Sequence, residues 1–191
     1  MPITITGHTA VPYLDLIDQA GDPAVLGRLQ RNGDILRYYE GNAALQVTGL
    51  QRVRRASNGS AITLDTDLSN DDTITLPVGI SETWEFLLSL GYTGGTTEDF
   101  KIDFSIPTGA SGTYSIQGAG TGGGNLPLHG VSLTTATGIG YTGIDTHALI
   151  RGTLITDTNA GNFVLRWAQN TSGATSTNIL AGTELTMWRV A

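Results

Sequence analysis

Three glycines form the pattern in this 191-residue chain that most directly suggests chemistry. The stretch QGAGTGGGNL, residues 117–126, holds Gly118, Gly120 and Gly123 in the spacing G-x-G-x-x-G. In a dinucleotide-binding loop this spacing follows a strand and opens a helix whose N-terminus holds the pyrophosphate. Here NLPLHGVSLTT follows, and Pro127 interrupts any helix. The pattern therefore predicts a surface loop between strands, without a cofactor.

Two further sets of side chains are of types that bind metals or catalyse reactions, but each set is incomplete. Asp145 and His147 share one side of an expected strand, and a metal site would need His129 as a further ligand. A hydrogen-bonded histidine, or a histidine ring on an oligomer axis, explains them as well. Glu82 and Glu85 could form a glycosidase carboxylate pair, but such a pair needs a cleft and a fixed separation. Solvation of a strand edge is the preferred interpretation, so we expect no catalytic residue and no bound metal.

Charge is distributed unevenly along the chain. Residues 1–60 carry six arginines and five acidic residues, a net charge of +1, and residues 61–191 carry four basic and twelve acidic residues, a net charge of −8. An acidic body repels phosphates and anionic lipids, so neither nucleic acid nor a membrane is an expected partner. No run of 18 apolar residues and no secretory signal is recognisable. The chain has no cysteine, which excludes disulfides and thiolate metal sites.

The elements that would position these residues read as strands. The chain holds 28 threonines and 26 glycines, which favour strands and turns respectively. The stretch DFKIDFSIP alternates strictly, with an apolar face of Phe100, Ile102, Phe104 and Ile106 and a wet face of Asp99, Lys101, Asp103 and Ser105. The stretch TWEFLLSL likewise places on one face Trp84, Phe86, Leu88 and Leu90. Further strands are expected at 61–67, 72–78, 112–117, 129–136, 146–157, 161–170 and 182–190. Strands without helices predict an all-β fold, a jelly-roll β-sandwich.

Two late strands are apolar on both faces. In TELTMWRV, Leu185 and Met187 face one side and Trp188 faces the other, and in NFVLRWA, Val164 lies opposite the large aromatic residues. A sandwich covers only one face of each sheet, so the second face needs another cover. A sister subunit is the simplest cover, which makes these four residues candidates for an interface. A loop or the N-terminal arm folding over that face is the alternative.

The first 60 residues differ from the body. An extended arm with the apolar patch VPYLDLI precedes a small β-meander over residues 21–56, in which Asn32-Gly33 is a hairpin signal. The segment RASNGSA, residues 55–61, has the composition of a linker. We therefore predict an attachment region over residues 1–60 and a jelly roll over residues 61–191. The candidate docking residues of the first region are Tyr13, Leu14, Leu16, Ile17, Arg52, Arg54 and Arg55.

Two segments of the body carry short motifs that occur in order in a known family. Residues 81–116, SETWEFLLSLGYTGGTTEDFKIDFSIPTGASGTYSI, contain a TWxFxxxL strand, a Gly/Thr turn and DFKxxFxxPxGAxGxxS. Residues 147–191 contain a GTL strand, AGxFxLxWAQNTS and a closing AGTxLxxxRV. In these motifs the chain resembles bacteriophage virion proteins. The resemblance covers residues 62–191, departs at residues 117–130, and leaves residues 1–60 unmatched.

The resemblance implies a tumour-necrosis-factor-like jelly roll, which typically forms trimers, in a tail-associated, fibre or head-decoration protein. We therefore expect a non-enzymatic structural protein on the surface of a phage particle. In this prediction a homotrimeric knob attaches through its N-terminal region to other virion proteins, of the capsid or of the tail. The alternative is a receptor- or carbohydrate-binding module of a phage tail, in which Tyr92, Tyr114 and Tyr141 stack on a host-surface glycan.

Overall fold

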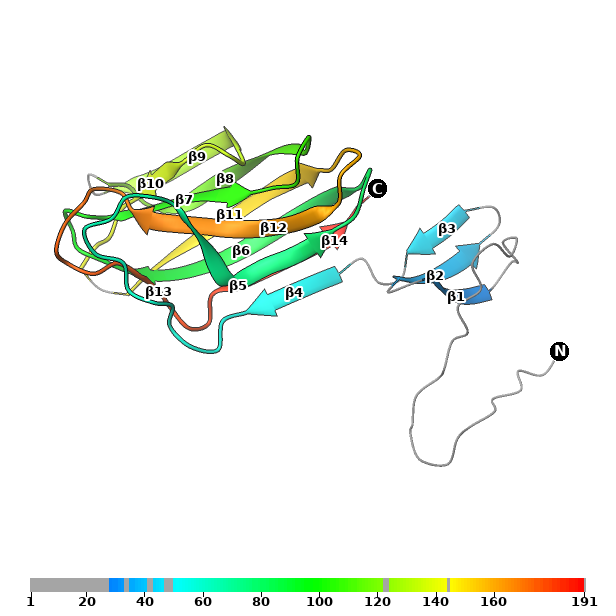
Figure 1. Ribbon diagram of the computed structural model, residues 1–191, viewed down its shortest axis with the longest axis horizontal. Coiled ribbons are helices and arrows are strands. Elements are labelled where there is room, and N and C mark those ends of the chain that lie inside the picture. Colours follow the sequence, from blue (N-terminus) through cyan, green and yellow to red (C-terminus); the bar gives the residue numbers. More distant parts are fainter. Residues whose placement is uncertain are drawn as a thin grey trace, which may run out of the picture. The chain divides into compact units, whose positions relative to one another are not determined.

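The computed structural model describes residues 28–32, 35–40, 43–46, 50–121, 124–143 and 145–190 (Figure 1). The chain divides into two compact units, Met1–Gly49 and Leu50–Ala191. The boundary observed between the units thus lies at Leu50, ahead of the predicted position at residue 61. Within the described residues, no helix is long and apolar enough to cross a membrane.

The first unit contains an antiparallel meander. Its strands are β1 (Arg28–Asn32), β2 (Ile35–Glu40) and β3 (Ala43–Gln46), in the spatial order β1-β2-β3. The pairing of Asn32 with Ile35 makes β1 and β2 a hairpin, as the Asn-Gly signal predicts. A three-stranded meander therefore lies inside the predicted range of residues 21–56, but residues 50–54 of that range form β4 of the second unit.

The second unit is a sandwich of two antiparallel sheets, which lie as two layers in Figure 1. The small sheet has the order β10 (Thr137–Ile139), β7 (Phe100–Ser105), β12 (Gly161–Gln169) and β5 (Ser69–Val78). The large sheet has the order β4 (Leu50–Arg54), β14 (Glu184–Arg189), β6 (Thr83–Thr93), β11 (Thr146–Ile155), β8 (Ser111–Ala119) and β9 (Asn125–Ser132), and β13 (Asn178–Ile179) also pairs with β6. No described residue is helical, and the predicted all-β jelly-roll sandwich is confirmed.

Aromatic rings fill the space between the two sheets. Phe86 of the large sheet lies 5.3 Å from Phe104 and 4.9 Å from Phe163 of the small sheet, measured between ring centroids. Phe104 and Phe163 stack at 4.8 Å. Such contacts add to the free energy gained from burying the rings. The apolar faces predicted for β6 and β7 are confirmed, because Trp84, Phe86, Leu88, Leu90, Phe100, Ile102 and Phe104 are all buried.

The face of β7 predicted to be wet is only partly so. Asp103 is 1% exposed, because the register places it opposite Arg166 of β12, which binds its carboxylate. Asp99 is also buried, and its carboxylate accepts a hydrogen bond from the Tyr141 backbone N–H. Lys101 reaches the Thr66 carbonyl with its ammonium group. Of the four residues predicted to be wet, Asp99 and Asp103 are therefore buried, and Lys101 and Ser105 are half-buried.

Two predictions for the start of the second unit are wrong. Residues 61–67 do not form a strand and contribute only the isolated bridge between Ile62 and Thr177. Leu64 has φ of 56°, which interrupts an extended conformation. Residues 55–61 are not a linker, because Arg55 is buried and the Gly59 N–H bonds to the Ile179 carbonyl. Pairing of β4 with β14 draws this segment into the sandwich.

The glycine-rich segment is part of a β-hairpin. Gly118 lies in β8, and the Gly120 N–H bonds to the Gly124 carbonyl at 2.9 Å before β9 begins at Asn125. A strand follows the turn, so the helix N-terminus that holds a pyrophosphate is missing from this described segment. The loop predicted over residues 117–126 is therefore too long: Gly118 belongs to β8, residues 125 and 126 belong to β9, and Gly123 lies outside the described residues.

Candidate interaction surface on the large sheet

The large sheet presents one face to the small sheet and one face away from it, here called the outer face. Side chains alternate between the two, so positions such as Glu85 and Leu87 of β6 point outward while Phe86 points into the core. Strand register arranges the outward positions in two rows across the sheet. One row is Trp188, Glu85, Thr153 and Thr113, and the other is Thr186, Leu87, Arg151 and Ser115.

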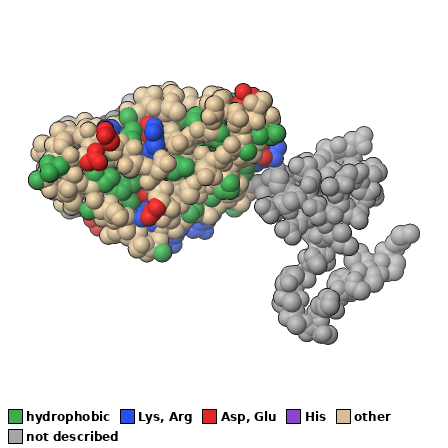
Figure 2. Space-filling view, in the orientation of Figure 1, with side chains coloured by type: hydrophobic (Ala, Val, Ile, Leu, Met, Phe, Trp, Pro, Cys, Tyr) green, Lys and Arg blue, Asp and Glu red, His purple; other side chains and the backbone are tan. Residues whose placement is uncertain are grey.

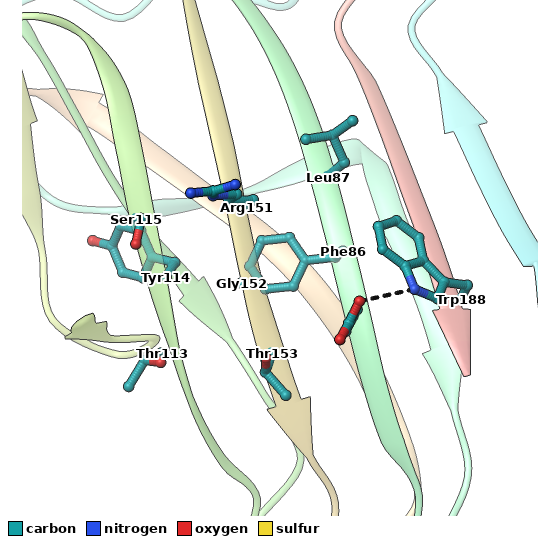
Figure 3. Close-up of a pocket in the computed structure, with 10 residues that line it drawn as sticks. Phe86, Leu87, Thr113, Tyr114, Ser115, Arg151, Gly152, Thr153 and Trp188 are labelled. Carbon is teal, nitrogen blue, oxygen red and sulfur yellow. Dashed lines mark hydrogen bonds between the residues drawn. The ribbon is translucent and has the colours of Figure 1, made fainter. Parts of the chain in front are cut away.

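A groove of about 520 Å³ lies between these rows, and Figure 3 shows the side chains around it. Its floor is formed at Phe86, Gly152 and Tyr114, which the register places side by side. A Cβ at Gly152 would lie 2.3 Å from the Thr113 carbonyl oxygen and 2.7 Å from the Phe86 ring. Only glycine at position 152 therefore permits β8 and the Phe86 ring to approach this closely.

Polar groups at the two sides of the groove behave differently. The Trp188 indole N–H donates to Glu85 Oε2 at 3.0 Å, the bond drawn in Figure 3. Arg151 stands on β11 between Leu87 and Ser115 in the register. Among the described residues, no carboxylate oxygen lies within 4.0 Å of the Arg151 guanidinium. The groove thus contains a carboxylate held by Trp188 and a guanidinium that has no ionic partner in the described part of the chain.

Large hydrophobic side chains are exposed around the groove. Of the seven that are exposed among the described residues, five belong to the outer face or its border: Leu50, Leu87, Leu149, Ile155 and Val190, between 37% and 66% exposed. Leu87, Leu149 and Ile155 occupy outward positions on the central strands β6 and β11. Leu50 pairs with Trp188, and Val190 directly follows β14. A concentration of this kind is typical of a surface that contacts another protein.

The four residues predicted to form a subunit interface do not lie on one surface of the structure. Leu185 and Met187 are fully buried and face the core, so they have no surface to offer a neighbouring copy. Val164 is 8% exposed and belongs to β12 of the small sheet. Trp188 is the one of the four that lies on the outer face. The two-sided apolar pattern of β14 therefore came from one core face and one outer face.

The residues predicted to dock on the particle also do not form one surface in the described part of the chain. Tyr13, Leu14, Leu16 and Ile17 lie outside the described residues. Arg54 is exposed on β4, and Arg52 forms an ion pair with Glu184. Arg55 does not suit a docking role, because it is buried.

Arg55 instead joins the start of the sandwich to β5. Its guanidinium donates to both carboxylate oxygens of Asp71, at 2.7 and 2.8 Å, and to Asp72 at 2.7 Å. Burial acts to lower the pKa of Arg55, but the hydrogen bonds and charges of Asp72 and Asp71 outweigh it and raise that pKa. The Trp167 indole N–H also donates to Asp71. This cluster is structural and holds the chain that follows β4 against the small sheet.

The aromatic residues predicted for glycan stacking are mostly not accessible. Tyr92 and Tyr114 are buried, and their hydroxyl groups donate to the carbonyls of Gly140 and Thr135 at 2.6 and 2.8 Å. Burial raises the pKa of both phenols. Tyr141 is half-buried. Stacking of a sugar on Tyr92 or Tyr114 is therefore excluded by their position in the core.

The acidic residues and histidines considered above as catalytic or metal-binding candidates do not form such sites in the described structure. Glu82 is buried rather than solvated, and it accepts hydrogen bonds from the Trp84 indole at 2.9 Å and from Arg189 at 2.8 Å. His129 and His147 are exposed. The described part of the chain contains no cluster of three or more side chains able to hold a metal ion.

Sequence reasoning missed the aliphatic part of the outer face. Leu87 in TWEFLLSL and Leu149 in HALIRGTLI occupy positions that alternation assigns to the wet side of each strand. These two leucines interrupt the apolar–polar alternation, and that interruption was the sequence signal that could have predicted an apolar outer face. Only the register shows that Leu87, which lines the groove, and Leu149 are diagonal neighbours on one face.

No family model matches this chain, and no curated protein matches it significantly. Among solved structures, the chain is similar to one in the structure of infectious bursal disease virus Gt strain, with 10% identity and a TM-score of 0.21, covering 92% of this chain and 50% of that one. For the Gx strain of that virus the values are 10%, 0.18, 88% and 45%. This chain thus spans about half the length of those chains. At these TM-scores the likeness carries no argument about function.

Proposed function

We propose that this protein is a non-enzymatic structural component of a phage particle, in which three copies associate through the outer face of the large sheet. Its N-terminal region attaches the trimer to the capsid surface or to a tail structure. The observation that carries the proposal is the outer face itself, with five exposed aliphatic side chains on it or at its border. The motifs that resemble phage virion proteins supply the biological setting, and they fall on β6, β7, β8, β11, β12 and β14.

Burial of this face between copies follows from the hydrophobic effect. Removing apolar surface from water contributes roughly 25 cal/mol per Å², and a stable interface buries on the order of 800 Å² on each partner. Leu87 and Leu149 lie near the centre of the face and Ile155 and Val190 near one end, and the row of Trp188, Glu85, Thr153 and Thr113 lies between these two apolar groups, as in an interface that combines apolar and polar contacts. Three copies around one axis would close such a contact without leaving an unpaired face.

The first test is the mass of the purified protein in solution. A chain of 20.0 kDa is expected to scatter light at three times that mass at micromolar concentration. Leu87→Asp combined with Leu149→Asp should give monomers, because two carboxylates would then be buried in the contact. Leu64→Asp is the matched control, since Leu64 is 70% exposed but lies away from the outer face in the segment before β5. A monomeric wild-type protein would refute the proposal.

Attachment is tested separately on particles that lack the protein. A chain beginning at Leu50 retains β4, which pairs with β14, whereas a chain beginning at Ala61 loses that strand and Arg55. We expect the chain from Leu50 to form trimers that no longer bind particles, and electron microscopy of the bound full-length protein to locate it on the head or the tail. Binding of the shortened chain with full affinity would refute attachment through the N-terminal region.

A further inference from the structure

Two opposite charges lie in the groove of the outer face without pairing to each other. Glu85 and Arg151 are exposed on the adjacent strands β6 and β11. Glu85 directs its carboxylate to the Trp188 indole on β14, which is on the side of β6 opposite to β11. Within the described residues, this indole is the one hydrogen-bond donor to Glu85, and it occupies Oε2 only. Oε1 and the whole Arg151 guanidinium therefore remain open to a second molecule.

Four other arginines of the second unit form ion pairs within the chain. Ion pairs join Arg52 to Glu184, Arg55 to Asp71, Arg166 to Asp103 and Arg189 to Glu82. Arg54, which has no ion pair among the described residues, lies on the edge strand β4. Arg151 differs because it lies on β11, in the interior of the sheet, among exposed leucines. A cover placed on the outer face would remove Arg151 from water.

An unpaired charge is costly at a buried contact. Transfer of a guanidinium or a carboxylate out of water is unfavourable unless an opposite charge and hydrogen bonds replace the solvent. If copies of this chain cover the apolar part of the outer face, both Arg151 and Glu85 lose water together. Each then needs a partner, and the lining of the groove contains one charge of each sign.

We propose that the Arg151 guanidinium of one copy binds the Glu85 carboxylate of the next copy, so that this ion pair fixes the register in which the copies associate. The inference rests on the proposed function, because it requires self-association through the outer face. In a closed ring of three copies every subunit would contribute Arg151 to one contact and Glu85 to the other. The Trp188 indole serves as a positioning group, since it holds the carboxylate in place through Oε2. Such pairs govern specificity more than affinity.

The experiment is a charge-reversal cycle on the full-length protein, read by sedimentation or light scattering over a range of concentrations. Arg151→Glu and Glu85→Arg should each weaken association about a hundredfold, because each places like charges at the contact. The double variant, which restores opposite charges, should recover association to within about tenfold of wild type. Glu85→Gln keeps an acceptor for the Trp188 indole and removes the charge, so it should also weaken association. Asp67→Arg, a reversal at an exposed loop residue, is the matched control and should have no effect.

The outcomes separate this inference from the proposed function. Wild-type trimers that tolerate Arg151→Glu would overturn the ion pair and leave the trimer standing. Weakened single variants without recovery in the double variant would also overturn it, provided that thermal melting shows the subunits folded. A wild-type protein that stays monomeric would refute the proposed function itself.

Discussion

The outer faces of the two sheets carry the same kinds of residue in different arrangements. On the small sheet, Arg166 of β12 lies directly opposite Asp103 of β7 and donates to it from Nε at 2.7 Å and from a terminal nitrogen. On the large sheet, Arg151 lies opposite Leu87 and Ser115, and the nearby Glu85 turns away from it. Arg166 and Asp103 thus pair with each other within the chain, whereas Arg151 and Glu85 do not pair with each other.

Apolar side chains are also more exposed on the outward side of the large sheet than on that of the small sheet. Val164 and Ala168 on the small sheet are 8% and 0% exposed, whereas Leu149 and Ile155 on the large sheet are 41% and 49% exposed. Figure 2 shows one side of the second unit, on which charged side chains are few and scattered among uncharged ones. The outward apolar side chains of β12 are therefore buried within the fold, whereas Leu149 and Ile155 of the large sheet remain exposed to solvent.

The largest expected effect concerns the core that both sheets share. Phe104→Ala should lower the free energy of unfolding of the subunit by about 3–5 kcal/mol, because Phe104 is fully buried against Phe86, Phe163 and Tyr114. Denaturant unfolding measures this change. A loss below about 1 kcal/mol would contradict the packing between the sheets.

The next effect distinguishes the two outer faces directly. Arg166→Ala should destabilise the subunit by about 3 kcal/mol, because the side chain of Asp103, 2% exposed, would keep a buried charge without its cation. Arg151→Ala in the dissociated subunit should change stability by less than about 0.5 kcal/mol, because that guanidinium is exposed and lacks an ion pair among the described residues. Both are measured by denaturant unfolding at a concentration below that of association. Equal losses in the two variants would remove the contrast between the faces.

The smallest effect is a pH dependence at Asp99, directly before β7. Burial raises the pKa of Asp99 above the ordinary value of 3.8, the Tyr141 N–H bond opposes this shift, and the charge of Glu98 adds to it. A raised pKa in the folded state means that Asp99 favours folding below pH 3.8, and this contribution is lost as the pH rises through the raised pKa.

Asp99→Asn tests this direction with little other change. Asparagine tolerates the φ of 53° found at this position and retains an acceptor for the Tyr141 N–H. The variant should therefore gain stability relative to wild type between pH 3 and pH 7, measured by urea unfolding at both values. A difference between the two proteins that is the same at both pH values would contradict the shift.

The alternation of apolar and polar residues predicted a strand correctly where the neighbouring strands alternate in the same way. In β6 and β7, apolar residues recur at every second position, so the buried face follows from the backbone period alone. The segment 61–67 shows a similar pattern but forms one bridge, because Leu64 adopts a positive φ and its N–H bonds to the Gly173 carbonyl. A pairing partner, which short-range pattern does not specify, decides whether such a segment becomes a strand.

The sequence by itself determined an all-β chain with an acidic body, because threonine, glycine and period-two alternation suit strands and turns and little else. It also indicated that some strands are apolar on both sides. Only the tertiary structure decided which side of each strand faces the core, placing Leu185 and Met187 inside and Trp188 outside. The tertiary structure alone also paired Arg166 with Asp103 and left Arg151 without an ionic partner among the described residues. The reason is that long-range strand register sets which side chains meet, and register depends on how the whole sheet packs.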